Sequence, residues 1–415
     1  MNTIDDLRAT LQHHAADLPD ELDHARSASV HQRVRVARQR RRAVVAGGIA
    51  SALAVTVGGV GLAALVSHRS SELRPLAGHT PPARMTSLGF GYSFVEGKAG
   101  DGTVTIDFDA SDSPRLVSWA GSSAGAVEVE VRDQQIGDAS DFGNFTTISP
   151  GETGPVTVTG RGKVALAVYR LDTLAPGVTG DGSVFRDEVA GDSLLGAAFG
   201  DASHPVRLQV SSPTGRLRLA STCRHAPSGT WLTVEVDGEM TTSGECYGDH
   251  GDVDAGVGGG TFDIDTGTHT VTSRLTQGMD GPAVEAAPGL EFGVGVYAAA
   301  RPVTADSPFQ MDPQIEYDGH VWAWSRSSAG APGAPSFHTQ LHDGRVLVLV
   351  EHTRVAKGPV VWGKLDGRTG AGFGGGGTGS AGLGIAQDGA QVSVRIDGDP
   401  GPRARVGIAV YTLVE

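Results

Sequence analysis

Two glycine-rich segments of the chain match motifs that carry chemistry in enzymes. Residues 121–125, Gly-Ser-Ser-Ala-Gly, fit the G-x-S-x-G pattern of a nucleophilic serine, which needs a strand before it and a helix after it. Residues 126–131 instead alternate apolar and polar as a strand does, so we predict a hairpin loop. Residues 370–375 match G-x-G-x-x-G, but no helix follows to hold a phosphate, and we predict a glycine-rich loop. No nucleophile, base and orienting group can be grouped from the sequence, so we expect no enzyme activity.

Aspartate and histidine residues gather at three places where a metal ion could bind. The groups are Asp107, Asp109 and Asp112; Asp249, Asp252 and Asp254; and His338, His342 and His352. Calcium takes about six to eight oxygen ligands, so three carboxylates could supply half of a site, but solvated loop carboxylates are the commoner explanation. The histidines are interpreted as surface residues rather than as metal ligands. We therefore expect no cofactor, with calcium as the alternative.

The chain has two cysteines, Cys223 and Cys246. An even pair in an oxidising compartment is typical of a disulfide, and no nearby CxxC or HxxxC spacing supports a metal site. We predict a Cys223–Cys246 disulfide, on the condition that this part of the chain is exported. Closing a loop of some 24 residues would contribute about 3 kcal/mol to stability in the chain-entropy model.

Three tryptophans lie in the last hundred residues, at Trp322, Trp324 and Trp362. Because large aromatic side chains usually fill a core, we predict that all three are buried. The alternative is an exposed aromatic platform that binds a sugar.

The elements that must position these residues are strands. Residues 104–109 and 127–132 alternate apolar and polar side chains, as half-buried strands of an antiparallel sheet do. Clusters of Gly, Pro, Asp and Ser separate such segments at short intervals, and no stretch after residue 67 has sustained helical spacing. We predict a mainly β exterior.

Three strand ends are alike. Each is apolar on both faces and finishes in a tyrosine, at Tyr169, Tyr297 and Tyr411, so each should be a central core strand. The tyrosines are 128 and 114 residues apart, close to the length of about 100 residues of a β-sandwich. We predict three tandem antiparallel β-sandwich domains, at residues 87–171, 193–298 and 314–415.

An uncharged apolar run precedes the β part. Residues 43–66 contain no charge, Pro, Asn or Gln, and as a helix they would span roughly 36 Å, more than the hydrocarbon core of about 30 Å. Six arginines stand directly before them, and such a positive flank stays on the cytoplasmic side. We predict a single-pass protein of the bacterial cell membrane, with a transmembrane helix at 43–66, a linker at 67–86 and the C-terminal part outside. A cleaved signal peptide is the alternative, but its apolar region would be shorter.

Residues 1–42 are predicted to be helical and cytoplasmic. Ile4, Leu7 and Leu11 fall on one face at spacings of three and four, and a piece this small cannot bury that stripe by itself. The stripe therefore needs a partner, the bilayer surface or a second copy. The alternative is a tail whose arginines only set the orientation.

The formal charge of −14 is unevenly divided. Residues 1–42 sum to +2 and the span carries none, which leaves −16 for the exterior. An acidic exterior argues against binding nucleic acid or anionic polymers, whose phosphates need Lys and Arg. The alternative explanation is that net negative charge keeps an exterior protein soluble.

The layout of residues 1–66 resembles that of single-pass membrane proteins of high-GC Gram-positive bacteria, some of which regulate extracytoplasmic-function sigma factors. The resemblance rests on the acidic amphipathic start, the arginine cluster and the single span. It implies that residues 1–42 could bind a cytoplasmic protein such as a sigma factor. Residues 1–42 contain histidines but no cysteine, which excludes the zinc-type subclass with its Cys-x-x-Cys.

Two functions are therefore expected. The first is a membrane-tethered exterior module that binds an extracytoplasmic protein or a glycan, or is structural, without catalysis and without a nucleic-acid partner. The second is a transmembrane regulator that acts through residues 1–42.

Overall fold

The computed structural model of the protein describes residues 73–414, except positions 123–126, 132–133, 137–140, 181, 202–203, 247–252, 257–259, 280, 285–288, 305–306 and 375. The described chain is mainly antiparallel β-strand, which confirms the prediction of a mainly β fold. Within these residues there is no helix of the length and apolar character that crossing a membrane requires. The predicted span at 43–66 and the predicted helices of residues 1–42 lie outside the described residues.

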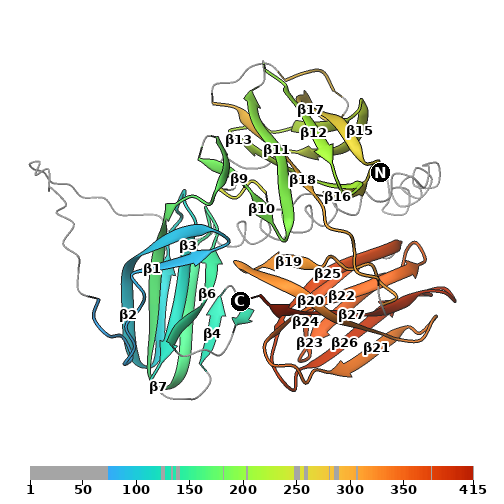
Figure 1. Ribbon diagram of the computed structural model, residues 1–415. Helices are drawn as coiled ribbons and strands as arrows, with labels where there is room; N and C mark the ends of the chain where they lie inside the picture. Colours follow the sequence, from blue (N-terminus) through green and yellow to red (C-terminus); the bar gives the residue numbers. More distant parts are fainter. Residues whose placement is uncertain are drawn as a thin grey trace, which may run out of the picture. The chain divides into compact units, whose positions relative to one another are not determined.

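Two groups of nine strands share one topology (Figure 1). We divide the strands into three sets along the chain. The second set, β10 to β18, forms two sheets with the orders β10-β11-β18-β13-β16 and β12-β17-β14-β15. The third set, β19 to β27, has the same two orders, β19-β20-β27-β22-β25 and β21-β26-β23-β24. Without its first strand, each set has the strand order of a jelly roll, two four-stranded sheets linked as Greek keys.

The strands of the second set are β10 (Glu188–Val189), β11 (Asp192–Asp201), β12 (Val206–Ser212), β13 (Arg216–Arg224), β14 (Thr230–Val236), β15 (Glu239–Glu245), β16 (Gly260–Asp263), β17 (Gly267–Gln277) and β18 (Glu291–Ala298). Those of the third set are β19 (Gln314–Tyr317), β20 (His320–Ala329), β21 (Ser336–Gln340), β22 (Val346–Val355), β23 (Val360–Leu365), β24 (Arg368–Gly374), β25 (Gly377–Ala386), β26 (Gln391–Asp397) and β27 (Arg405–Leu413).

The first set reaches the same arrangement with fewer, longer strands. It consists of β1 (Arg84–Ser87), β2 (Phe90–Phe108), β3 (Arg115–Gly121), β4 (Glu128–Val131), β5 (Gln134–Ile136), β6 (Asp141–Ile148) and β7 (Gly154–Thr173). One half of the β2–β7 pair lies beside β1 and β3, and the other half lies beside β4. A register shift between Asp101 and Thr103 separates the halves, so each long strand takes the place of two strands of the other sets.

The three tyrosine-ended strands are central, as predicted. β7 lies between β2 and β3, β18 between β11 and β13, and β27 between β20 and β22. Their two faces serve different cores: in β27, Ile408 and Val410 pack between the two sheets, whereas Ala409 and Tyr411 pack on the outer side with Trp322. Burial on both faces explains why these strands read as continuous apolar runs.

Several hairpins use the tight turn that matches strand twist. Asp237-Gly238, Asp318-Gly319 and Asp366-Gly367 have positive φ at both residues and join β14 to β15, β19 to β20 and β23 to β24. Two consecutive left-handed residues make a type I′ turn, for which Asp-Gly is among the preferred pairs. These turns set the register of the sheets, and with it the side to which each following side chain points.

The segments between the predicted domains are packed. Within the predicted linker, Ala77 is buried in the first core and β1 begins at Arg84. After the first set, β8 (Gly177–Gly180) and β9 (Ser183–Arg186) form a separate hairpin. Before the third set, Phe309 and Met311 are buried against Trp322 and Tyr411. These connectors fold onto the cores because they contain apolar residues, Ala77, Phe309 and Met311, whose side chains are buried there.

Candidate ligand-binding face

One row of residues crosses the outer side of the four-stranded sheet of the third set. Ser336, Arg395, Trp362 and Gly372 are direct register partners on β21, β26, β23 and β24. Their chain neighbours Val361 and Val394 are buried in the core, so strand alternation places this row on the opposite side, toward solvent. The next row along the strands is His338, Ser393, Lys364 and Thr369. We call these eight residues the Trp362 face.

Trp362 is the exposed aromatic residue of this face. It is 36% exposed, and among the described residues it is the one aromatic side chain with large exposure. A Cβ added to Gly372 would lie 2.3 Å from Cζ3 of the indole, so the ring covers the bare backbone of that glycine. The glycine thus makes room for the indole to lie across β24.

Polar side chains surround the indole. His338, Lys364 and Arg395 are exposed, and Ser336 and Ser393 are half-buried. Together they offer hydroxyl, imidazole, ammonium and guanidinium groups within one or two strand positions of the ring. A flat aromatic surface bordered by hydrogen-bond donors and acceptors fits a sugar, because a pyranose has an apolar C–H face and hydroxyls at its edge.

The matching outer face of the second set carries Trp231 of β14, which is half-buried, and no fully exposed ring is found among the described residues of the matching faces of the first two sets. The turns align Trp362 with Thr233 of β14 and Gly372 with Ser243 of β15, and these two hydroxyls lie 3.2 Å apart. In the first set, Thr105 and Thr157 form a similar cross-strand pair at 2.9 Å. The third set therefore has a large–small pair where the second set has a polar pair.

The prediction that three tryptophans are buried is correct for one of them. Trp322 is fully buried, Trp324 is half-buried and donates its Nε1–H to Ser327 Oγ, and Trp362 is exposed. Position along a strand decides the side. Gly363, next to Trp362 in the sequence, is neither apolar in the usual sense nor polar, so the alternation around Trp362 is not evident from the sequence. The glycine segment 370–375, expected to be a loop, is strand β24 as far as Gly374.

A second cluster of functional groups is buried around Arg186, at the end of β9. Its guanidinium forms two hydrogen bonds to Glu316 of β19, at 3.0 and 2.5 Å, and its Nε donates to Asp254 at 2.9 Å. The backbone N–H of Ala190 donates to the same Glu316 at 3.0 Å. These contacts join segments from three parts of the chain in an ion-pair network that is closed to solvent.

The charges of this cluster shift the titration of their neighbours. Burial disfavours the charged form of Arg186, but its bonds to Glu316 and the nearby Asp254 hold its pKa above the usual value. Burial raises the pKa of Asp254, and burial with the Asp254 charge raises the pKa of Tyr92 to about 12. Because every carboxylate here is held by Arg186, the cluster stabilises the fold and offers no free acid or base for chemistry.

The tip of the β19–β20 hairpin adds further contacts to the first set. Thr146 Oγ1 donates to Asp318 at 2.6 Å, Ser87 Oγ donates to the Gly319 carbonyl at 2.8 Å, and the His320 ring stacks on Phe145 at 4.1 Å. Burial, then the charge of Arg345, lowers the pKa of His320 to about 4, so it is neutral at pH 7.

One buried carboxyl lies apart from these clusters. Glu351 of β22 is 2% exposed and accepts a hydrogen bond from Ser380 Oγ at 2.6 Å. Burial, opposed by that hydrogen bond, raises the pKa of Glu351 to about 8, so it is mostly protonated at pH 7.

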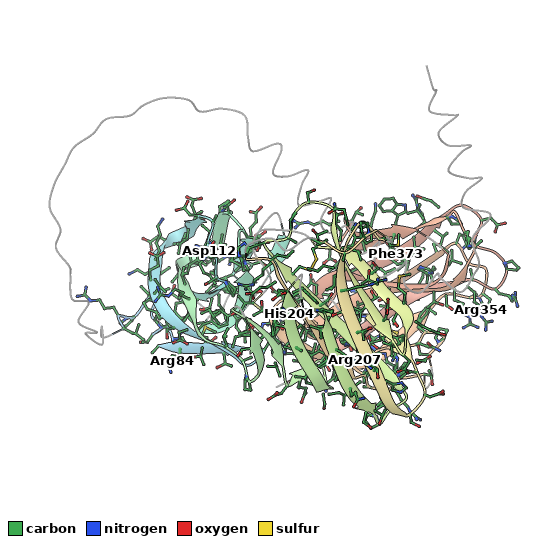
Figure 2. The ribbon with its side chains drawn as sticks, turned by 90° about the horizontal axis from the view of Figure 1, so that it is seen from above. Arg84, Asp112, His204, Arg207, Arg354 and Phe373 are labelled. Carbon is green, nitrogen blue, oxygen red and sulfur yellow. A yellow bond between two sulfur atoms is a disulfide. The ribbon has the colours of Figure 1, made fainter. Side chains whose placement is uncertain are left out.

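The cysteine prediction is met, while the metal candidates separate. Cys223 of β13 and Cys246, just after β15, form a disulfide with their Cα atoms 5.6 Å apart, which links the two sheets of the second set. Asp112 is exposed (Figure 2), as are Asp107 and Asp109. Asp249 and Asp252 lie outside the described residues, and Asp254 is bound to Arg186.

No group of three His, Cys, Asp or Glu residues in the described part of the chain could hold a metal ion. His338 and His342 are exposed as predicted, but His352 is buried and stacks on Phe373 at 5.0 Å. Ser122, from the G-x-S-x-G segment, accepts a hydrogen bond from the backbone N–H of Lys163 at 2.9 Å. It thus has a structural partner at the end of β3.

No protein-family model and no curated protein sequence matches the chain. Among solved structures, the chain is similar to an uncharacterized protein of Listeria monocytogenes determined with glucose, magnesium and calcium, at 11% identity, TM-score 0.16, 65% coverage of this chain and 27% of that one. A Paenibacillus xanthan lyase gives 12%, 0.17, 79% and 35%, and a Bacillus subtilis oxalate decarboxylase variant gives 9%, 0.13, 52% and 74%. The chain thus spans about a third or less of the first two proteins, and likenesses at these TM-scores carry no argument about function.

Proposed function

We propose that this protein is a membrane-tethered, extracytoplasmic binding protein without catalytic activity, and that the Trp362 face binds a glycan. The observation that carries the proposal is the exposed indole laid over Gly372 and bordered by polar side chains. Burying an exposed tryptophan against a sugar ring would remove apolar surface from water on both sides. The bordering groups would supply the directional hydrogen bonds that select one sugar.

In this proposal the exterior consists of three tandem copies of one β-sandwich domain, at residues 87–171, 193–298 and 314–415. The recurrence of one strand order supports the repeat. Residues 43–66 form the single transmembrane helix, with residues 1–42 cytoplasmic, and the length and uncharged character of that run support the tether.

Binding rather than catalysis is proposed because the titratable groups described in the interior serve as structural partners. The Arg186 cluster is a closed ion-pair network, and Glu351 is hydrogen-bonded to Ser380 away from solvent. The proposed ligand site accordingly uses no metal and no cofactor.

The test is a fluorescence titration of the full chain in detergent with fragments of peptidoglycan and with a soluble neutral β-glucan. We expect one of these glycans to change tryptophan emission and to bind about tenfold or more weakly to Trp362→Ala, since central tryptophans dominate many binding sites. Met240→Ala is the control, because Met240 is also an exposed apolar residue on an outer face but lies in the second set. Equal affinity of both variants would reject the Trp362 face.

A second function is supported by residues 1–42. Their apolar stripe at Ile4, Leu7 and Leu11 needs a partner, and a cytoplasmic protein such as a sigma factor would supply one. An affinity capture from membranes, comparing the full chain with a variant that lacks residues 1–42, tests this regulator function. A cytoplasmic protein lost with the deletion supports it, and identical captures contradict it.

A further inference from the structure

Two arginines lie on one surface pocket of the third set. Arg354 and Arg403 line a pocket of about 440 Å³ together with Ala356, Pro400, Gly401 and Pro402. The pocket lies between the loop from β22 to β23 and the loop from β26 to β27, and the N–H of Ala356 donates to the Pro400 carbonyl across it at 3.2 Å. It is an open depression at the surface rather than an enclosed cavity, so it would hold an end or a side group of a ligand.

Neither arginine has an ion-pair or hydrogen-bond partner among the described residues, although the protein is rich in carboxylates. Some arginines are paired, as Arg186 is with Glu316 and Arg218 with Asp192, whereas other exposed ones, such as Arg170 and Arg207, have no ion pair among the described residues. Arg354 and Arg403 differ from those in lining one pocket together. A guanidinium holds a carboxylate or phosphate with two parallel hydrogen bonds, so two arginines on one pocket form a suitable site for an anionic group.

The backbone holds Arg354 at this place. Its φ is +56°, in the left-handed region that non-glycine residues rarely adopt. The register of β22 shifts between His352 and Val355, so Arg354 stands on a bulge that turns its side chain out of the sheet. Figure 2 shows Arg354 at the outer margin of the side chains.

The charge around the pocket differs from that of the whole exterior. Residues 314–415 contain nine Lys or Arg and nine Asp or Glu, so they are neutral, and the whole exterior charge of −16 falls on residues 67–313. Between residues 354 and 405 there are seven basic and four acidic residues. The argument that an acidic exterior repels anionic polymers therefore does not apply to the third set.

The pocket lies at the end of the strands that carry the Trp362 face. From the row of Trp362 and Arg395, the next pair outward is Val360 and Asp397, about 7 Å along the strands. Pro359 and Gly398 follow and are in contact, and the two loops of the pocket begin there. A chain of a few sugars laid along β23 and β26 would reach from the indole to the arginines.

We propose that the Arg354–Arg403 pocket binds the carboxylate or phosphate group of an anionic glycan whose sugar ring stacks on Trp362. The proposal rests on the glycan function of the Trp362 face and names its ligand class. One anionic group lies between the two guanidinium groups, and the polymer continues across the face. Binding weakens as salt is raised, because the contact is a charge pair near the surface.

The test compares three soluble polymers, polygalacturonate, a phosphomannan and a neutral β-glucan, binding to the full chain in detergent at low salt. In Arg354→Gln/Arg403→Gln we expect about tenfold or greater loss of affinity for the charged polymer that binds, since charged hydrogen bonds are removed. Arg170→Gln/Arg207→Gln is the control, because both arginines are exposed and lie outside the third set, and it removes the same charge. Which charged polymer binds tells whether the pocket takes carboxylate or phosphate.

The outcomes separate this proposal from the one it rests on. Equal affinities of the two double variants, or no binding of either charged polymer, overturn the anion pocket. If Trp362→Ala loses the neutral glucan while Arg354→Gln/Arg403→Gln keeps all ligands, the glycan face holds and the pocket fails. If only the arginine variant loses the charged polymer, the pocket is supported and the stacking role of Trp362 fails.

Discussion

At the scale of single residues, one pair of positions distinguishes the four-stranded sheet of the third set from that of the second. Thr233 and Ser243 of the second set occupy the positions that Trp362 and Gly372 have in the third set. Each pair consists of cross-strand neighbours on the outer side of its own four-stranded sheet. The polar pair satisfies itself with a hydrogen bond, whereas the indole and glycine leave an apolar surface open. Covering an exposed apolar surface with a ligand lowers the free energy, because apolar surface is removed from water.

Glu351 makes stability depend on pH in a predictable direction. Its pKa is about 8 in the folded state, against an ordinary value of 4.5, because it is buried. Below pH 4.5 both states are protonated and there is no cost. Between pH 4.5 and 8 the folded state keeps a proton that the unfolded state releases, so stability falls as pH rises, and above pH 8 the whole cost is present.

Glu351→Gln removes this cost while it keeps the shape and an acceptor for Ser380. We expect the variant to match the parent near pH 4.5 and to be more stable at pH 9 by on the order of 5 kcal/mol, because each pKa unit corresponds to about 1.4 kcal/mol. The measurement is urea unfolding of the full chain in detergent at both pH values. Glu239→Gln, at an exposed strand position, is the control, and a pH-independent difference for Glu351→Gln would contradict the assignment.

At the scale of elements, each set begins with a hairpin that has the same kind of turn. β1–β2, β10–β11 and β19–β20 all turn on two residues with positive φ, at Leu88-Gly89, Ala190-Gly191 and Asp318-Gly319. The third of them contributes Glu316 to Arg186 and Asp318 to Thr146, so it joins segments that are far apart in the chain. The third hairpin therefore makes contacts with distant parts of the chain because its turn region contains the acidic residues Glu316 and Asp318.

Arg186→Met tests how much the buried network contributes. It would leave Asp254 and Glu316 buried without their cation, and we expect a loss of about 3–5 kcal/mol in the free energy of unfolding. Replacing the carboxylates as well, with Asp254→Asn and Glu316→Gln, should recover most of the loss because no buried charge then remains. Thermal and urea unfolding of the full chain report both values.

The matched control for this network is Arg274→Met. Arg274 pairs with Glu235 at 3.3 Å on an outer face, with 61% of its side chain exposed, so we expect a cost below about 1 kcal/mol. Equal losses in Arg186→Met and Arg274→Met would mean that the network around Arg186 is solvated in solution.

The strands could be predicted from the sequence, while the sites could not. Apolar–polar alternation and continuous apolar runs ending in tyrosine locate half-buried and central strands, since burial imposes these patterns directly. The side to which Trp362 points depends on register set by the Asp366-Gly367 turn and its bulge. Arg186 lies 68 and 130 residues from its two partners, and local pattern carries no information on such contacts.

At the scale of the whole molecule, charge is segregated along the chain. The acidic surplus lies in residues 67–313, whereas residues 314–415 are neutral and carry both Trp362 and the unpaired arginines. A polymer with negative charge would meet repulsion over most of the exterior and attraction at one part of it. This distribution favours specific binding by the third set over general adhesion.

The disulfide bears on our proposal that residues 67–415 lie outside the membrane. Cys223 and Cys246 are 23 positions apart and join the two sheets of the second set, and such bonds persist in oxidising compartments and are reduced in the cytosol. In the tethered orientation that we propose, the full chain should need detergent for release from membranes and should show no thiol that alkylates without reductant. A variant that lacks residues 43–66 should be soluble and alkylate at both cysteines, because it stays in the cytosol.

Mass spectrometry after alkylation with and without reductant distinguishes these states, and urea unfolding measures what the bond contributes. The oxidised chain should be more stable than the reduced one by about 3 kcal/mol, because the bond limits the unfolded chain. Two free thiols in the full chain taken from cells would contradict the exterior location. Release of the full chain without detergent would contradict the tether, and the third set would then have to meet its ligand as a secreted protein.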